Sequence, residues 1–188
     1  MRSKLSLLLS FVPIKTSAKP RTSIPICLKV SLFLTAFLLL ASPLTAQVNS
    51  DKAAVFEDVG HKALAAMKAR AEELKIQGVA VIAYAEGETV SAWSSKMVVV
   101  GSLKTPATEK DPGSNLLAIA YSKAAEMADT LKASGTAGRK PMKGEFGWQG
   151  GLVRKGKTGI LIAAFSGGKS EDDVKVSQAG LDVLTTAL

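Results

Sequence analysis

Two short β-prone runs, each beside a tight turn, most constrain the fold of this chain. Residues 79–84 precede a Glu-Gly turn and a second β-prone stretch at 89–93. Residues 152–154 precede a Lys-Gly turn and a longer apolar run at 158–165. Runs joined by such short turns pair as antiparallel hairpins. The sequence therefore predicts two hairpins, which form the sheet of the domain.

Three amphipathic stretches flank these hairpins. Apolar residues recur at intervals of three and four over 51–75 and again after Ser114, where Gly135 suits the helix end. A last helix is expected from about Ser170, with Asp173 at capping-box spacing from it. We therefore predict an α+β single domain with an antiparallel sheet, in the order helix, hairpin, helix, hairpin, helix.

The first 46 residues have the features of an export signal. They carry six basic residues and no acidic one, an uncharged apolar run at 30–40, and small residues up to Ala46. That run is shorter than the roughly 20 apolar residues of a membrane span. We expect residues 1–46 to be a signal peptide cleaved after Ala46, with an uncleaved anchor as the alternative. Residues 47–188 would then be a periplasmic or secreted domain without a stable membrane span.

Charge and cysteine content exclude several function classes for residues 47–188. Of the 24 basic residues in the chain, 18 remain there against 16 acidic ones, a net charge of +2. Nucleic-acid binding needs concentrated positive charge, so we expect no nucleic-acid partner. The only cysteine, Cys27, lies in the leader. The domain therefore has neither a disulfide nor a thiolate metal site.

The C-terminal half resembles a known family. The resemblance rests on the Gly150-Gly151 start of the second hairpin, the Ser166-Gly167-Gly168 turn, the acidic helix start at 171–173 and Gln-Ala-Gly-Leu at 178–181. Residues 47–188 are similar in these features to the GlcG/HbpS-like haem-binding family. The resemblance implies a small α+β domain that homo-oligomerises and binds haem or another small ligand at or between subunits. Residues 95–98 lack the Arg and Asp that relatives carry, so a site depending on them does not carry over.

His61 is the only histidine of the chain and lies on the first predicted helix. A neutral imidazole can be an axial ligand of haem iron. The position between two apolar residues of the helix suits a ligand at a subunit edge, and it equally suits an ordinary surface histidine. His61 is the candidate haem ligand.

The turn Ser166-Gly167-Gly168-Lys169 lies between a predicted strand and a predicted helix. Backbone N–H groups at such a place can bind a haem propionate or a small carboxylate, with Lys169 adding charge. The alternative is a tight turn in which the glycines have positive φ.

Phe146 and Trp148 lie in a glycine-rich loop. They are predicted to cover a flat ligand or to form an oligomer contact, and simple anchoring of the loop is the alternative.

Catalytic motifs give no indication of an enzyme. There is no nucleophile elbow, no histidine-containing metal cluster and no second histidine for a triad. The preferred hypothesis is an exported, homo-oligomeric protein that binds haem. The alternatives are an enzyme or accessory protein acting on a small hydroxy- or oxo-acid, and a structural oligomeric module without a ligand.

Overall fold

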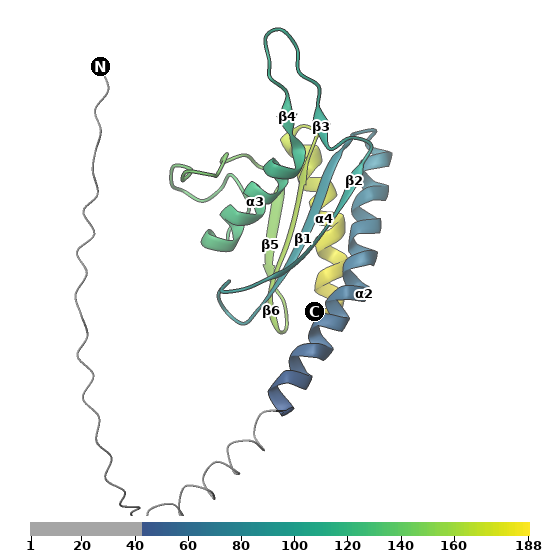
Figure 1. Ribbon diagram of the computed structural model, residues 1–188, viewed down its shortest axis with the longest axis vertical. Helices are drawn as coiled ribbons and strands as arrows, with labels where there is room; N and C mark the ends of the chain where they lie inside the picture. The colour runs from purple at the N-terminus through teal and green to yellow at the C-terminus, as the bar shows by residue number, and fades with distance from the viewer. Residues whose placement is uncertain (1–42) are drawn as a thin grey trace, which may run out of the picture. The chain divides into compact units, whose positions relative to one another are not determined.

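A four-stranded antiparallel sheet has helices on both of its faces (Figure 1). The computed structural model describes residues 43–188. The elements, in chain order, are α2 (Pro43–Glu73), β1 (Gly78–Glu86), β2 (Ser94–Val100), β3 (Lys104–Thr105), β4 (Ser114–Asn115), α3 (Leu116–Thr130), β5 (Gly151–Lys155), β6 (Gly159–Ser166) and α4 (Ser170–Ala187). The predicted α+β class, with two hairpins between three helices, is confirmed.

The two hairpins join through their most apolar strands. The sheet order is β2-β1-β6-β5, and β1 pairs antiparallel with β6 from Val79–Ser166 to Glu86–Gly159. Almost every residue of these two central strands is buried. Helices cover both faces of the sheet, so both sets of side chains meet apolar partners. This explains why the two runs are continuously apolar and do not alternate with polar residues.

Each face of the sheet has its own core. On one face α2 and α4 pack over the sheet, with Phe56, Met67, Phe165 and Leu184 fully buried. On the other face α3 packs through residues that include Ile119, Ala120 and Met127. Successive strand residues point to opposite faces. Phe165 therefore belongs to the α2–α4 core, whereas its neighbour Ala164 belongs to the α3 core.

The return strand of the first hairpin lies later than predicted. β2 spans 94–100 and not 89–93, because β1 continues to Glu86 and pairs with β2 from Gly78–Val100 to Tyr84–Ser94. The connecting residues 87–93 form a loop. Val90 and Trp93 in this loop pack against the α3 core. The apolar character that suggested a strand here serves tertiary packing.

Helix ends also differ from the sequence prediction. α3 begins after Asn115, whose side chain accepts a hydrogen bond from the third helical amide, and it ends at Leu131 in the left-handed conformation with φ 51°. Gly135 is therefore not its end. The predicted capping box of α4 is wrong, because Lys169 is the N-cap and no side chain caps the helix. The Asp173 carboxylate is used elsewhere, as described below.

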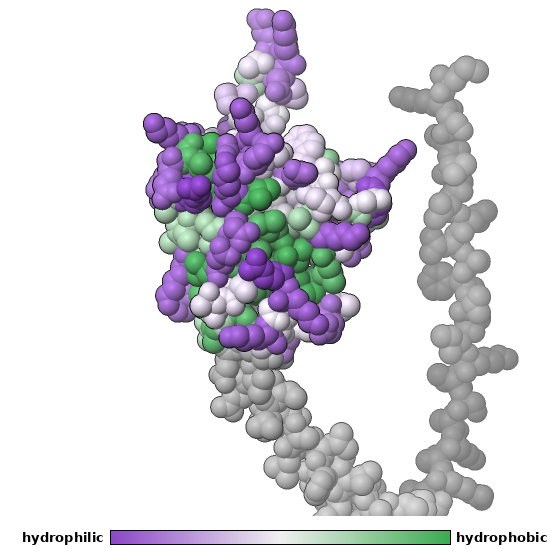
Figure 2. Space-filling view, turned by 180° about the vertical axis from the view of Figure 1, so that it is seen from behind, coloured by the Kyte–Doolittle hydropathy of each residue, from purple (hydrophilic) through white to green (hydrophobic). Residues whose placement is uncertain are grey.

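Residues 101–113, which follow β2, contain the short strand β3, which pairs with β4. The segment between them extends from the domain as a largely polar projection at the top of Figures 1 and 2. Figure 2 also shows apolar side chains between the polar ones on the face turned away from the viewer in Figure 1.

The predicted signal peptide lies almost wholly outside the described residues. The expected cleavage point after Ala46 falls in the first turns of α2. Residues 44–188 form one compact unit. Among the helices that the structure describes, none has the length and apolar character needed to cross a membrane.

Candidate functional sites

The predicted site residues lie in two separate places. His61 projects from α2 into a groove that this helix forms with the edge strand β2. Ser166, Gly167, Gly168 and Trp148 line a different pocket, at the end of β6 and the start of α4. The two cavities share no residue. The sequence-based hypothesis assigned His61 and the Ser166 turn to the same ligand, whereas the fold places them in separate cavities.

The groove beside His61, here called the His61 groove, has a volume of about 420 Å³. Its apolar part comes from both elements, and two lysines accompany the histidine; the lining consists of His61, Leu64, Ala65, Lys68, Lys96, Met97 and Val98. The His61 side chain is 69% exposed. The cavity volume lies in the range typical of small-molecule sites, roughly 300–1,000 Å³.

Glu57 connects the polar groups of this groove. Its carboxylate lies 3.3 Å from the His61 Nε2 atom, one helical turn away, and it accepts a hydrogen bond from Lys96. The hydrogen bond from Lys96, with a smaller contribution from His61, holds the pKa of Glu57 below its ordinary value. A ligand that takes the Nε2 atom of His61 must therefore replace Glu57 there.

The second cavity, here called the Ser166 pocket, has a volume of about 210 Å³. Besides the predicted turn and Trp148, it is lined by Lys123 and Ile119 of α3 and by Ser170 of α4. Lys169 is exposed and acts as the helix N-cap, and it does not line the pocket. The turn has glycine because of a close approach. A Cβ atom on Gly167 would lie 1.9 Å from the carbonyl oxygen of Gln77.

Lys123 and Asp173 form a buried ion pair beside this pocket. The Lys123 ammonium donates to the Asp173 Oδ2 atom and to the carbonyl oxygen of Phe165, both at 2.7 Å. The other carboxylate oxygen of Asp173 accepts from the Gly168 amide at 2.8 Å. Side-chain exposures are only 3% and 4%. The pair thus joins α3, β6 and α4 at one point.

Burial acts against the charged form of both partners. Desolvation raises the pKa of Asp173, and the attraction of Lys123 opposes this. Desolvation lowers the pKa of Lys123, and the attraction of Asp173 opposes this in turn. Each charge is tolerated in the interior because the other lies beside it. Removing either one leaves an uncompensated charge.

The sequence contained a signal for this pair that the prediction missed. Lys123 is seven residues after Leu116 and three after Ala120, so it lies on the buried stripe of its helix. Asp173 lies on the buried side of α4, where Val176 and Ser177 follow at the same spacing. A charge on an apolar stripe is almost always paired. The partner, 50 residues away, is not evident from spacing.

Phe146 and Trp148 lie against each other, with ring centroids 4.9 Å apart and planes tilted by 34°. Both are about half exposed. Only Trp148 lines the Ser166 pocket, whereas the Phe146 backbone amide donates to the Ser122 hydroxyl of α3 at 3.1 Å. The pair therefore combines a pocket wall with an anchor for the loop.

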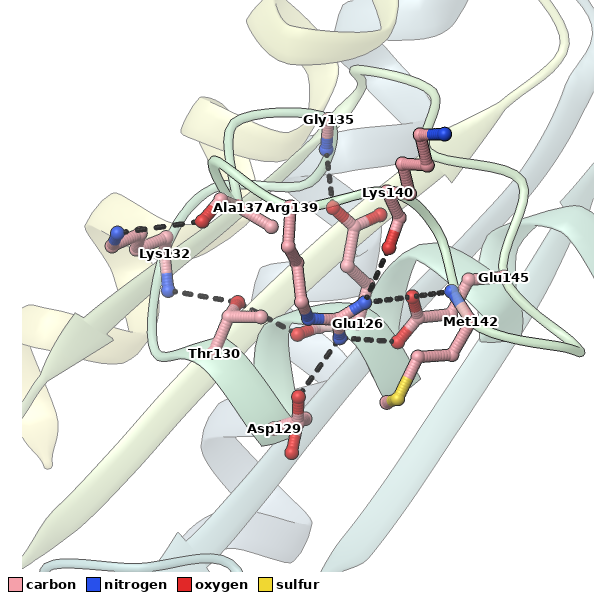
Figure 3. A network of polar contacts seen from close by, with 10 residues as sticks. All are labelled: Glu126, Asp129, Thr130, Lys132, Gly135, Ala137, Arg139, Lys140, Met142 and Glu145. Atoms are coloured by element: carbon pink, nitrogen blue, oxygen red, sulfur yellow. Dashed lines mark hydrogen bonds and ion pairs between the residues drawn. The ribbon is translucent and has the colours of Figure 1, made fainter.

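The loop that carries these aromatic residues is tied to α3 by Arg139 (Figure 3). Its guanidinium contacts both carboxylate oxygens of Glu145 and one of Asp129, at 2.7–2.8 Å. Glu145 also accepts from the Met142 amide. The hydrogen bonds from Arg139 lower the pKa of Glu145 to about 2. These contacts join residues without periodic spacing, so no sequence pattern indicates them.

A neighbouring contact closes the start of the same loop. The buried Glu126 side chain accepts from the Gly135 amide at 2.9 Å (Figure 3).

Within the described residues, no group of three or more histidine, cysteine, aspartate or glutamate side chains could hold a metal ion.

Comparison with known proteins gives a likeness of fold. No family model matches this sequence. No curated protein matches it either. The crystal structure of a PduOC:heme complex is 16% identical, with a TM-score of 0.48 over 67% of this chain and 91% of that chain. The Klebsiella pneumoniae protein ORFY, of family DUF336, is 17% identical, with a TM-score of 0.47 over 70% of this chain and 90% of that chain.

Proposed function

We propose that this protein binds haem in the His61 groove. The observation that carries the proposal is the placing of the only histidine over an apolar groove with two lysines beside it. An imidazole is an axial ligand of haem iron. Lysine ammonium groups suit the propionates of the same molecule as hydrogen-bond donors. The donor set of the groove thus fits the group.

Five of the seven lining residues have a definite part in this proposal. His61 would hold the iron through its imidazole, and Lys68 and Lys96 would face the propionates. Leu64 and Val98 would contact the porphyrin plane, where apolar surface is removed from water. Haem, once bound, would supply an iron centre with redox and ligand-binding chemistry. Glu57 would leave the Nε2 atom and keep its contact with Lys96.

Titration of the purified protein with hemin tests this proposal. We expect a saturable shift of the Soret absorption band, and a loss or displacement of that shift in His61→Ala. Lys62→Ala is the matched control, because Lys62 is an exposed neighbour on α2 that does not line the groove. No Soret change in the parent protein would remove the binding claim. An unchanged spectrum in His61→Ala would remove the assignment of the iron ligand.

The proposal includes a second subunit at the same groove. β2 is an edge strand, and its residues from Lys96 to Val99 are only partly buried, so the groove lies at the border of the sheet. A second copy placed there would cover the bound ligand. Light scattering with and without hemin tests this point. A strict monomer in both conditions would contradict the subunit-interface part of the proposal and leave the hemin titration valid.

We also propose that residues 1–46 direct export to the periplasm or outside the cell. The basic leader, the apolar run and the small residues before Ala46 support it. N-terminal sequencing of the protein recovered from the extracytoplasmic fraction is the test. A chain that keeps residues 1–46 and stays in the cytoplasm would contradict it.

A further inference from the structure

The Ser166 pocket contains a polar group that the fold leaves without a partner. Ser166 is only 4% exposed, and no residue that the structure describes hydrogen-bonds to its hydroxyl. Among the described residues, no fully enclosed side-chain nitrogen or oxygen lacks a partner. The hydroxyl must therefore keep contact with open space. Strand alternation places it with Ala164 on the α3 face of the sheet, where the pocket lies.

A second donor at this pocket comes from Lys123. An ammonium group has three N–H donors. Two of them are used, by the Asp173 carboxylate and by the carbonyl oxygen of Phe165. Both Asp173 oxygens are already engaged, by Lys123 and by the Gly168 amide. The third N–H donor of the Lys123 ammonium therefore remains available to a ligand.

The start of α4 supplies backbone donors at the same place. The first amides of a helix have no partner within it. Here the N-cap residue Lys169 forms no side-chain bond that would replace one. The Asp172 and Asp173 amides donate to the Lys169 carbonyl oxygen, which leaves the amide of Ser170, a residue that lines the pocket. The partial positive charge of a helix N-terminus favours an anion.

Carboxylates near the pocket limit the charge that it can accept. The first turn of α4 contains Glu171, Asp172 and Asp173. Asp173 is neutralised by Lys123, and Asp172 forms an ion pair with Lys175 at 2.8 Å. A ligand is therefore held by individual hydrogen bonds and not by a large excess of positive charge. Such a site favours an anion with a single negative charge.

The remaining walls combine polar residues, namely Thr105, Ser114 and Gln149, with apolar ones. Leu116 and Ile119 of α3 are buried, and the half-exposed Trp148 stands at the rim. A water molecule occupies about 30 Å³ of liquid, so the pocket of about 210 Å³ holds on the order of seven waters. Such a volume suits an acid of a few carbon atoms and is half that of the His61 groove.

We propose that the Ser166 pocket binds a small monocarboxylate. The carboxylate accepts hydrogen bonds from the Ser166 hydroxyl, the third Lys123 donor and the Ser170 amide at the start of α4. The short carbon chain lies against Ile119 and Trp148. This site shares no lining residue with the His61 groove and does not depend on haem binding.

Titration with butyrate, followed by amide NMR of the full chain, tests the proposal. We expect saturable shifts at Gly167, Gly168 and Ser170. Losing one net hydrogen bond in Ser166→Ala should weaken binding roughly 3- to 10-fold. Ser94→Ala is the matched control, an exposed serine of β2 away from the pocket. The NMR spectrum of each variant also reports whether it is folded.

Three further arms identify the ligand class and separate this site from the groove. Butyramide should bind less tightly than butyrate, because its neutral carbonyl oxygen is a weaker acceptor for these donors than a carboxylate, and sulfate should also bind less tightly than butyrate. Trp148→Ala should reduce the preference for butyrate over acetate. His61→Ala should leave the titration unchanged, so the haem proposal and this one fail independently. Butyrate that produces no shifts, equal binding of sulfate, or Ser166→Ala with unchanged affinity would overturn the proposal.

Discussion

Replacing Lys123 by methionine tests the buried ion pair most directly. Methionine keeps most of the aliphatic length of the side chain, so packing against β6 and α4 changes little. The Asp173 carboxylate, 3% exposed, would then have only backbone amide donors, among them Gly168. The variant therefore isolates the cost of leaving one buried charge without its partner.

Breaking a buried pair by removing one partner costs about 3–5 kcal/mol. Single domains have free energies of unfolding of about 5–15 kcal/mol, so about a fifth or more of the stability would be lost. The corresponding fall in Tm is roughly 10–20 °C. Urea unfolding followed by circular dichroism measures the change in the free energy of unfolding. Lys169→Met, at an exposed lysine, should change it by no more than about 0.5 kcal/mol.

The loss should depend on pH in a defined direction. Burial already raises the pKa of Asp173, and the variant removes the attraction of Lys123 that opposes this rise. A carboxyl whose pKa is raised in the folded state binds its proton more readily there than in the unfolded chain. Its destabilising effect is complete above the folded pKa and disappears as pH falls below the unfolded value of 3.8. The stability deficit of the variant should therefore shrink in mild acid.

A second substitution provides the decisive control. Asp173→Asn removes the orphaned charge and keeps an acceptor for the Gly168 amide, so adding it to Lys123→Met should recover much of the loss. A single variant that costs less than about 1 kcal/mol, or a double variant no more stable than the single one, would refute the reasoning. Either result would mean that the Asp173 charge does not suffer from burial.

Three other substitutions give separate tests. Gly167→Ala should cost about 1–3 kcal/mol in urea unfolding, because the added methyl meets the Gln77 carbonyl oxygen; an unchanged midpoint would contradict the tight turn. An NMR titration should place the pKa of Glu145 at about 2, and Arg139→Gln should return it toward 4.5. Because this folded pKa is depressed, its contribution to stability is present above 4.5 and is lost as pH falls toward 2; a midpoint near 4.5 in the parent would disprove the contact. Asn115→Ala should lower thermal stability by about 1 kcal/mol through loss of the α3 cap, and no change would argue against capping.

Much of the local structure was predictable from sequence because it depends on local physical chemistry. The apolar runs that became β1 and β6 need burial on both faces, and their turns contain glycine at positions such as Gly87, where φ is 89°. The helices follow from periodicity. This reasoning failed at 89–93, because apolar residues are compatible both with a strand and with a loop that packs on the core. Val90 and Trp93 cover the α3 core from a loop, and spacing alone does not distinguish that from a strand.

The candidate sites were predictable only in part. The turn at Ser166 and the nearby Trp148 line one pocket, whereas Phe146 and Lys169 do not, and their role as ligand contacts stays a prediction. His61 was singled out by being unique, but its groove depends on Met97 and Val98 of β2, in the strand that was misplaced. The separation between His61 and the Ser166 turn depends on how the helices pack on the two central strands. Neither sequence motif contains information about that packing.

The sequence by itself determined the α+β class, the two hairpins, the three helices and the cysteine-free composition of residues 47–188. Tertiary structure alone decided that β1 and β6 pair, that Lys123 meets Asp173, and that Arg139 closes the loop on α3. Periodicity and turn chemistry act over a few residues. Contacts between residues tens of positions apart depend on two effects that arise only in the assembled core. These are the burial of both faces of the central strands and the free-energy cost of an unpaired buried charge.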